Sequence, residues 1–252
     1  MPTVLVTGAG RGLGLEFVRQ YASEGWSVLA GVRDVSRCPE LRALANAGTG
    51  TGAGANAGVA AARVEVHALD LADHASIDAL AAKLRGRRID VLLNNAGTMG
   101  KGSFAEQGIQ FGKFGGSDFA DWEHVLRINV LAPMKMAEAF VAHVAASEQK
   151  KIVSLTSVIG SIGKNTIGSL YAYRSSKAAL NAVMRSLAID LGRDYGIIAA
   201  PIHPGWARTE MGGPRADVDP VASVAGVRKV IAGLDKDRAG RFWMFDGSEL
   251  PW

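Results

Sequence analysis

The stretch that decides the fold lies near the N-terminus and reads Thr7-Gly8-Ala9-Gly10-Arg11-Gly12-Leu13-Gly14. It follows the apolar run Thr3–Val6 and opens a segment whose apolar residues recur at intervals of three and four. A strand, a glycine turn and a helix in this order place backbone N–H groups and a helix N-terminus against a pyrophosphate. Gly8 permits the tight turn, and Gly12 and Gly14 leave room for a phosphate or a neighbouring strand. An ordinary strand-to-helix turn is the alternative, because the chain has 31 glycines.

Length and composition indicate one α/β domain spanning residues 1–252. Hydrophobic residues make up 48% of the chain, which is enough to fill a sizeable core. The net charge of +4 comes from scattered basic residues, so we expect no nucleic-acid partner but an anionic ligand such as a nucleotide. Cys38 is the single cysteine, so no internal disulfide can form. No apolar run reaches the roughly 18 residues of a membrane span, and the chain begins with a strand, so we expect a cytoplasmic protein without a signal peptide.

Strand-like and helix-like segments alternate along almost the whole chain, and most of the strands are continuous apolar runs of the kind buried on both faces. Repeated βα units predict a doubly wound Rossmann fold of the α/β class, with a parallel seven-stranded sheet and helices on both faces. The expected strands are Val4–Thr7, Ser27–Val32, Val64–Leu69, Val91–Asn94, Lys151–Thr156, Ile197–His203 and Arg241–Phe245. The expected helices are Leu13–Glu24, Pro39–Ala47, Ala75–Leu84, Asp118–Ala146, Tyr173–Tyr195 and Pro220–Gly233.

Two glycine-rich stretches interrupt this alternation. Residues 43–62 are rich in alanine and glycine and can bury little surface, which predicts a surface loop before the third strand. We expect this tract to be weakly ordered and dispensable for function. Gly100–Gly116 follows the fourth strand, at the carboxyl edge of the sheet where ligands bind in this architecture.

Four polar features fall at the carboxyl ends of successive strands. Asn94-Asn95-Ala96-Gly97 ends the fourth predicted strand, and Ser157 ends the fifth. The next helix carries Tyr173 and Lys177 at the i,i+4 spacing that places both side chains on one helix face. The sixth strand is followed by Pro204-Gly205-Trp206-Ala207-Arg208-Thr209.

In order along the chain, these motifs read TGxxxGxG, NNAG, a serine, YxxxK and PGxxxT, and the chain resembles the short-chain dehydrogenase/reductase superfamily essentially from end to end. Within it, the chain is similar to the branch that contains the sniffer carbonyl reductase and the C-factor proteins. The segment between Ser157 and Tyr173 is longer than in many relatives, and we expect Asn165–Leu170 to absorb the difference as a loop. The residues that carry the resemblance to this branch are Tyr171–Arg174, His203–Trp206, Thr209–Gly213 and Asp246–Trp252.

The resemblance implies an oxidoreductase that reduces an aldehyde or ketone by hydride transfer from a nicotinamide cofactor. Tyr173 would donate a proton to the carbonyl oxygen, and acting near neutrality would require its pKa to fall from about 10 by roughly two to three units. The ammonium of Lys177, together with the charge of an oxidised nicotinamide, can lower it. Lys177 would also hold the nicotinamide ribose, and Ser157 would bind the substrate oxygen. Asn129 would hold a water that connects Lys177 to solvent.

The residues after the second strand distinguish NADP from NAD. An acidic residue there binds the adenosine ribose, whereas an arginine binds a 2′-phosphate. Asp34 is the signal for NAD, but Arg33 precedes it, and Arg37 and Arg11 add positive charge, so we favour NADP. The cofactor-binding residues implied by the resemblance are Gly8, Gly10, Arg11, Gly12, Leu13, Gly14, Arg33, Arg37, Asp70, Leu71, Asn95, Ala96, Gly97, Tyr173, Lys177, Pro204, Gly205 and Thr209.

Two other functions are consistent with the same residues. One is an NAD-dependent alcohol dehydrogenase, and the other, which the resemblance to C-factor proteins allows, is a nucleotide-binding signalling or regulatory protein. The expected partner is a small-molecule carbonyl or alcohol, no metal site is indicated, and the helices that begin at Asp118 and Tyr173 commonly form a homodimer face in this superfamily. Apolar residues that either line a substrate pocket or belong to the core are Met99, Ile162, Leu170, Trp206 and Met211.

Overall fold

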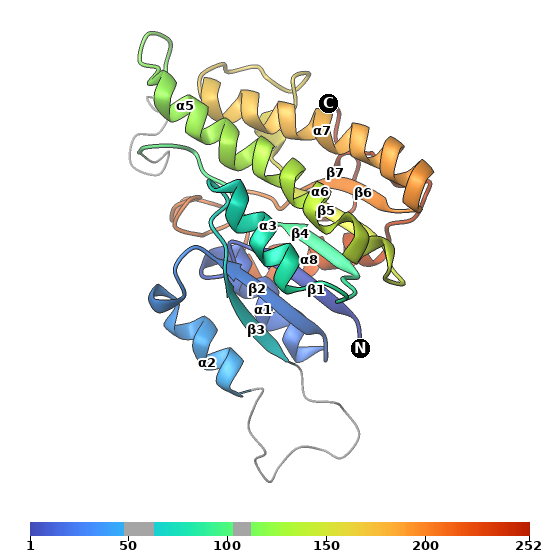
Figure 1. Ribbon diagram of the computed structural model, residues 1–252. Helices are drawn as coiled ribbons and strands as arrows, with labels where there is room; N and C mark the ends of the chain where they lie inside the picture. The colour runs from blue at the N-terminus through green and yellow to red at the C-terminus, as the bar shows by residue number, and fades with distance from the viewer. Residues whose placement is uncertain (48–62, 103–111) are drawn as a thin grey trace.

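The computed structural model describes residues 1–47, 63–102 and 112–252, which form a three-layer α/β structure (Figure 1). At its centre is a seven-stranded sheet with the strand order β3-β2-β1-β4-β5-β6-β7, and neighbouring strands are parallel throughout. The predicted doubly wound fold with a parallel seven-stranded sheet is therefore confirmed. The strands are β1 (Thr3–Thr7), β2 (Ser27–Val32), β3 (Val64–Ala68), β4 (Val91–Asn94), β5 (Lys151–Leu155), β6 (Ile198–His203) and β7 (Trp243–Met244).

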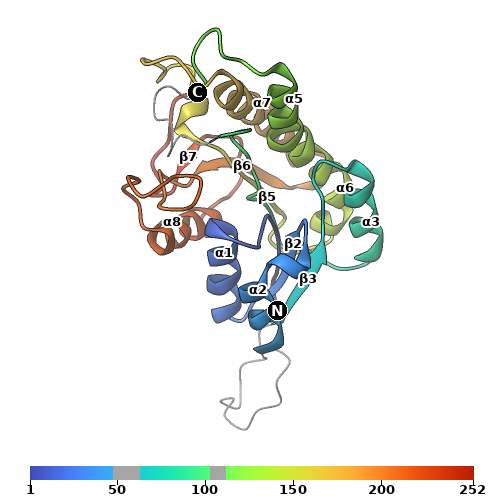
Figure 2. The same ribbon diagram turned by 90° about the vertical axis from the view of Figure 1, so that its left-hand side faces the viewer.

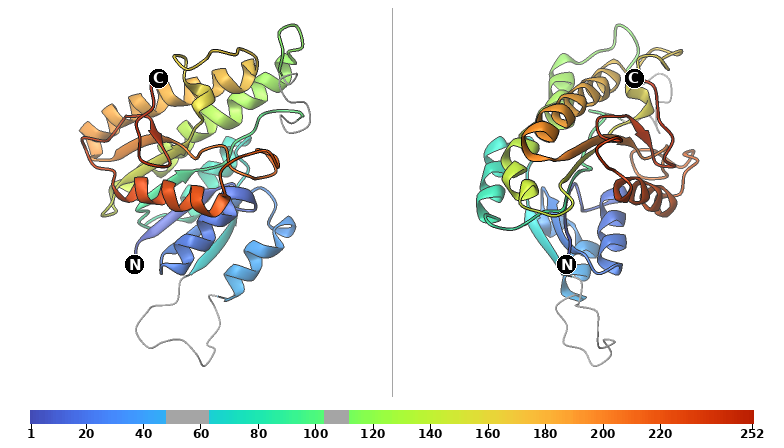
Figure 3. Two further views of the ribbon diagram at one scale, coloured as in Figure 1. Left: turned by 180° about the vertical axis from the view of Figure 1, so that it is seen from behind. Right: turned by 90° about the vertical axis from the view of Figure 1, so that its right-hand side faces the viewer.

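Helices cover both faces of the sheet (Figures 2 and 3). One apolar layer joins the sheet to α1 (Gly12–Ser23), α2 (Pro39–Ala47) and α8 (Pro220–Ala232). The opposite layer joins it to α3 (His74–Lys83), α6 (Ala132–Ala145) and α7 (Tyr171–Tyr195).

The position of each strand follows from its apolar pattern. Every residue of β1, β2, β4 and β5 is buried, whereas β3, at one edge of the sheet, is partly exposed.

β1 pairs with β2 on one side and with β4 on the other, so the strand order reverses at this point. A doubly wound sheet has its ligand crevice at the carboxyl ends of the strands that flank such a reversal. The motifs after β1 and β4 are therefore placed on the two sides of this crevice.

The helix predicted over Asp118–Ala146 is confirmed over residues 119–145, but it is not α-helical throughout. The segment consists of α5 (Phe119–Leu126), a π-helical turn over Arg127–Leu131, and α6. Pro133, in the first turn of α6, accounts for the interruption because proline has no N–H to donate to the carbonyl four residues earlier. The π-turn carries Asn129, and such turns occur frequently at functional sites.

The other differences from the predicted elements lie at element ends. The helix expected to begin at Tyr173 begins at Tyr171, and the strand expected over Arg241–Phe245 is limited to β7. The segment Asn165–Leu170 has no regular helix or strand, as predicted. These shifts leave the order of the elements unchanged.

Parts of the two glycine-rich stretches lie outside the described residues. Of the tract 43–62, residues 43–47 end α2, and residues 48–62 are not described. Of the stretch Gly100–Gly116, residues 103–111 are not described. Within the three described ranges, no helix combines the length and the apolar character needed to cross a membrane.

Candidate active site

The glycine loop after β1 fits a phosphate group. Gly8 and Gly12 have positive φ angles of 64° and 54°, and a β-carbon on Gly14 would lie 2.1 Å from the carbonyl oxygen of Gly8. A β-carbon on Gly10 would lie 2.5 Å from the sulfur of Cys38. Arg11 precedes α1, but its side chain makes no capping hydrogen bond to the helix. The uncapped helix N-terminus and the missing side chains fit the pyrophosphate of a nicotinamide dinucleotide.

The NNAG segment after β4 is fastened to this loop by hydrogen bonds. The Asn95 side chain donates to the backbone oxygens of Thr7 and Gly8, at 2.8 and 3.2 Å. The backbone N–H groups of Asn95 and Ala96 both donate to the Thr7 hydroxyl, at 3.1 Å each. Thr7, the first residue of TGxxxGxG, was not among the predicted site residues, although its place in the motif was a signal. These bonds hold Asn95 and Ala96 against the glycine loop, so that the two segments together border the ligand crevice.

The loop after β6 approaches the glycine loop from the opposite side. It begins at Pro204, whose carbonyl accepts a hydrogen bond from the Ser223 hydroxyl at 2.5 Å. The methyl group of Thr209 lies 3.6 Å from the position of a β-carbon added to Gly12. The backbone at Gly205 has a φ of 79°, which allows the sharp turn toward the crevice. The structure therefore brings the predicted residues of these two loops together.

Three arginines lie on the segments that follow β1 and β2. Arg33 and Arg37 follow β2, and both are exposed. Arg11, in the glycine loop, forms an ion pair with Glu210 of the loop after β6. Glu210 belongs to Thr209–Gly213, one of the segments that carry the resemblance to the sniffer branch, but it was not predicted as a site residue.

The carboxylates of Asp34 and Asp70 accept hydrogen bonds from residues two positions further along the chain. Asp34 accepts hydrogen bonds from the backbone N–H and the hydroxyl of Ser36, at 2.9 and 2.6 Å. These bonds lower the pKa of Asp34 from its ordinary value. Asp70, which follows β3, accepts from the backbone N–H of Ala72 at 2.9 Å, and Leu71 packs partly into the core.

Tyr173 and Lys177 lie on one face of α7, as the spacing predicted. The Lys177 ammonium is 5.7 Å from the centroid of the Tyr173 ring, and it donates to the backbone oxygen of Leu155 at 2.9 Å. The hydroxyl of Ser157 accepts a hydrogen bond from the backbone N–H of Ile159 at 3.2 Å. The Ser157 side chain also lies close enough to Tyr173 to lower the pKa of its hydroxyl. The three groups therefore meet where β5 ends and α7 begins.

Burial shifts the pKa values of these groups. It raises the pKa of Tyr173 to about 12, and the nearby Ser157 side chain opposes this rise. Burial lowers the pKa of Lys177 to about 8 and, as the main cause, that of nearby His203 to about 4. The lowered pKa expected for Tyr173 is not found in the protein alone, because desolvation disfavours the phenolate.

Asn129 is fully buried in the π-turn, and its side chain is fully engaged. Its oxygen accepts from the backbone N–H of Thr98 at 2.9 Å, and its amide donates to the Thr98 oxygen and the Ser176 hydroxyl at 2.8 and 3.0 Å. A β-carbon on Gly97 would lie 3.3 Å from the Asn129 oxygen and 3.5 Å from the Lys177 nitrogen. Asn129 thus lies beside Lys177 as expected, with Thr98 and Ser176 as partners that the sequence reasoning missed.

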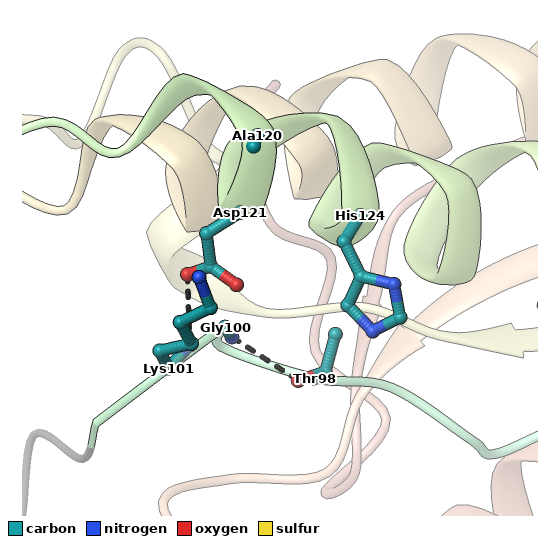
Figure 4. A pocket seen from close by; sticks show the side chains of 6 residues that line it. All are labelled: Thr98, Gly100, Lys101, Ala120, Asp121 and His124. Atoms are coloured by element: carbon teal, nitrogen blue, oxygen red, sulfur yellow. Dashed lines mark hydrogen bonds between the residues drawn. The ribbon is translucent and has the colours of Figure 1, made fainter.

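A pocket of about 320 Å³ opens between α5 and the segment after NNAG (Figure 4). The Asp121 carboxylate accepts from the backbone N–H of Lys101 at 2.8 Å, and the Lys101 ammonium pairs with Asp118. Within the described ranges, no group of three or more His, Cys, Asp or Glu side chains is placed to hold a metal. The residues that line the pocket are Thr98, Gly100, Lys101, Ala120, Asp121 and His124.

The five apolar residues that were predicted either to line a substrate pocket or to belong to the core differ in their exposure. Ile162, Trp206 and Met211 are exposed, with relative exposures of 78%, 43% and 43%. Leu170 is buried and Met99 is intermediate. Further aromatic side chains are exposed near the start of α7, where Phe114 and Tyr171 meet edge to face.

Comparison with known proteins identifies the family and its relatives. The short chain dehydrogenase family profile matches residues 2–219. The C-signal protein of Myxococcus xanthus is 39% identical over 164 residues, which cover 65% of this chain and 93% of that protein. The NADPH-bound carbonyl reductase from chicken fatty liver superposes with a TM-score of 0.85 at 30% identity, covering 100% of this chain and 99% of that chain. The Sniffer carbonyl reductase of D. melanogaster gives a TM-score of 0.85 at 28% identity and covers 100% of both chains.

Proposed function

The chain belongs to the short-chain dehydrogenase/reductase superfamily, and we propose that it is an NADPH-dependent carbonyl reductase that acts on aldehydes or ketones. One observation carries this proposal. Tyr173, Lys177 and Ser157 converge at the end of β5, with the Lys177 ammonium 5.7 Å from the centroid of the Tyr173 ring. A proton donor with a cation beside it is an arrangement suited to general acid catalysis at a carbonyl.

The bound reduced nicotinamide would supply the hydride to the carbonyl carbon. Tyr173 transfers its phenolic proton to the carbonyl oxygen, and Ser157 donates a hydrogen bond to the same oxygen. Lys177 stabilises the negative charge that develops on the Tyr173 oxygen as the proton leaves. Below its pKa of about 8, Lys177 is charged while Tyr173 is still protonated, which is the state that reduction needs.

Asn129 supports Tyr173 and Lys177 by holding Thr98 and Ser176 in place. Its side chain is used by Thr98 and Ser176, so the water that connects Lys177 to solvent would have to be held by another atom of the π-turn. The backbone carbonyl of Asn129 is the natural candidate, because Pro133 cannot donate to it. A proton returning to Tyr173 after each turnover would then travel through Lys177.

The choice of NADPH rests on the residues after β2. Arg33 and Arg37 are exposed beside the crevice, and the Asp34 carboxylate is held by Ser36, so the positive charges are the groups best placed to meet a 2′-phosphate. The solved relative from chicken carries NADPH, which supports the same choice. We also propose a cytoplasmic location and a small-molecule substrate.

A signalling role is the second candidate, and the 39% identity to C-signal favours it. It would need nucleotide binding but no turnover. The intact group of Tyr173, Lys177, Ser157 and Asn129 favours an enzyme instead, because burying the Lys177 ammonium beside a proton donor costs stability and such groups cluster at catalytic sites.

The deciding experiment measures oxidation of NADPH and of NADH by the absorbance of the reduced nicotinamide, with a panel of aldehydes and ketones. We expect turnover that is faster with NADPH. The Tyr173→Phe variant keeps the ring and its packing, so we expect it to bind NADPH normally and to lose at least about a hundredfold in turnover. Binding of NADPH without turnover on any carbonyl would favour the signalling role.

A further inference from the structure

Arg174 joins three segments around the proposed proton donor. Its Nε donates to the backbone oxygens of Gly168 and Ser169, at 3.0 Å each, and its Nη1 donates to the backbone oxygen of Ile159 at 3.2 Å. Burial lowers the pKa of this guanidinium from its ordinary value. The partly buried guanidinium hydrogen-bonds three backbone carbonyls rather than a carboxylate, so its interactions hold the backbone in place.

The backbone that Arg174 holds on one side is strained. Gly168, Ser169 and Leu170 have φ angles of 66°, 57° and 58°, and the left-handed region is unfavourable for the last two. Leu170 is nevertheless buried and directly precedes α7. Its N–H donates to the backbone oxygen of Gly112 at 3.0 Å, which ties the end of the loop after β4 to the same turn.

The backbone held on the other side carries Ser157. A 3-10 turn over Val158–Gly160 follows Ser157, whose side chain caps it. A β-carbon on Gly160 would lie 2.8 Å from Lys177, so this turn packs tightly on α7. Arg174 binds the carbonyl of Ile159 within the turn. One guanidinium therefore connects the segment of Ser157 to the strained start of the helix that presents Tyr173.

We propose that Arg174 is a positioning residue that sets the Ser157 segment and the Tyr173 helix at the separation needed to bind one substrate oxygen. This inference rests on the proposed reductase function. The side chain acts through backbone carbonyls and touches neither the proposed cofactor site nor the reacting atoms. Its removal lets the 168–170 turn relax and separates the two hydroxyls without altering the glycine loop.

The test is the Arg174→Ala variant of the whole protein, with Arg185→Ala as the matched control. Arg185 lies on the same helix and donates to a single carbonyl, that of Gly240. In Arg174→Ala we expect turnover to fall at least about tenfold, with the dissociation constant of NADPH changed less than about twofold. Added guanidinium ion should restore part of the turnover, and an equal concentration of sodium chloride should not. Arg185→Ala should show none of these effects.

Amide hydrogen exchange tests the inference without activity. We expect faster exchange across residues 157–174 in Arg174→Ala and unchanged exchange in β1 and α1. Unchanged exchange in 157–174, unchanged turnover, or an NADPH affinity that falls as far as turnover overturns the inference. If Arg174→Ala does not fold, Arg174→Lys decides, because one ammonium cannot reach both groups of carbonyls and turnover should fall several-fold. A wild-type protein that reduces no carbonyl refutes the proposed function, while the exchange result still decides the role of Arg174.

Discussion

Replacing Lys177 by methionine should slow reduction about a hundredfold at saturating NADPH. The ammonium lies 5.7 Å from the centroid of the Tyr173 ring. With the phenolate charge placed at the ring centroid and an effective dielectric constant of about 20, the ammonium stabilises it by roughly 3 kcal/mol. This energy corresponds to about two powers of ten in rate. Methionine keeps the length of the side chain and removes the charge together with the hydrogen bond to the Leu155 oxygen.

The pH profile of the wild type provides a second check on Lys177. Since burial lowers its pKa to about 8, Lys177 is charged below that pH and neutral above it. Turnover should therefore fall as the pH rises through about 8, and Lys177→Met should lack this limb. The matched control is Lys151→Met, because Lys151 is also a buried lysine that donates to carbonyls, those of Ile231 and Ala232 at the end of α8. It should lose stability and keep turnover. Retention of turnover within about tenfold in Lys177→Met would refute the electrostatic argument.

Two further substitutions test the cofactor site. Arg33→Ala should weaken NADPH binding by roughly 1.5–3 kcal/mol and leave NADH binding nearly unchanged, as measured by fluorescence titration, because a charge-assisted contact to the 2′-phosphate is lost. Equal weakening of both cofactors would show that Arg33 does not read the phosphate. Gly14→Ala should abolish cofactor binding or folding, measured by titration and thermal unfolding, since its β-carbon would lie 2.1 Å from the Gly8 oxygen. Normal affinity in this variant would mean that the loop is not held as described.

The sequence predicted the sheet and the meeting of its motifs well, because both follow from local patterns. Apolar runs such as Val4–Val6 and Val91–Leu93 are typical of strands buried on both faces, and alternation with helices then leaves few topologies. The spacing of Tyr173 and Lys177 fixed their common helix face without any knowledge of the tertiary structure. Residue roles remain predictions, because they depend on ligands rather than on the fold.

The π-turn and the engagement of Asn129 were not predictable from periodicity. Helical spacing continues through Arg127–Leu131, and only Pro133 marks a possible interruption. The side chain of Asn129 finds Thr98 and Ser176, which are 31 and 47 residues away in sequence. Such partners are set by how α5, α6 and α7 pack, and no single segment encodes them.

The direction of the Tyr173 pKa shift shows what a motif omits. The motif supplies a nearby cation, which lowers the pKa, but the fold also supplies desolvation, which dominates in the protein alone and raises it to about 12. Because Lys177 has a pKa of about 8, it loses its proton before Tyr173 does, so raising the pH removes the cation before the phenolate forms. In the protein by itself Tyr173 is therefore protonated, which is the form from which reduction starts. Alcohol oxidation must start from the phenolate, which in this site requires positive charge beyond Lys177, such as that of an oxidised nicotinamide.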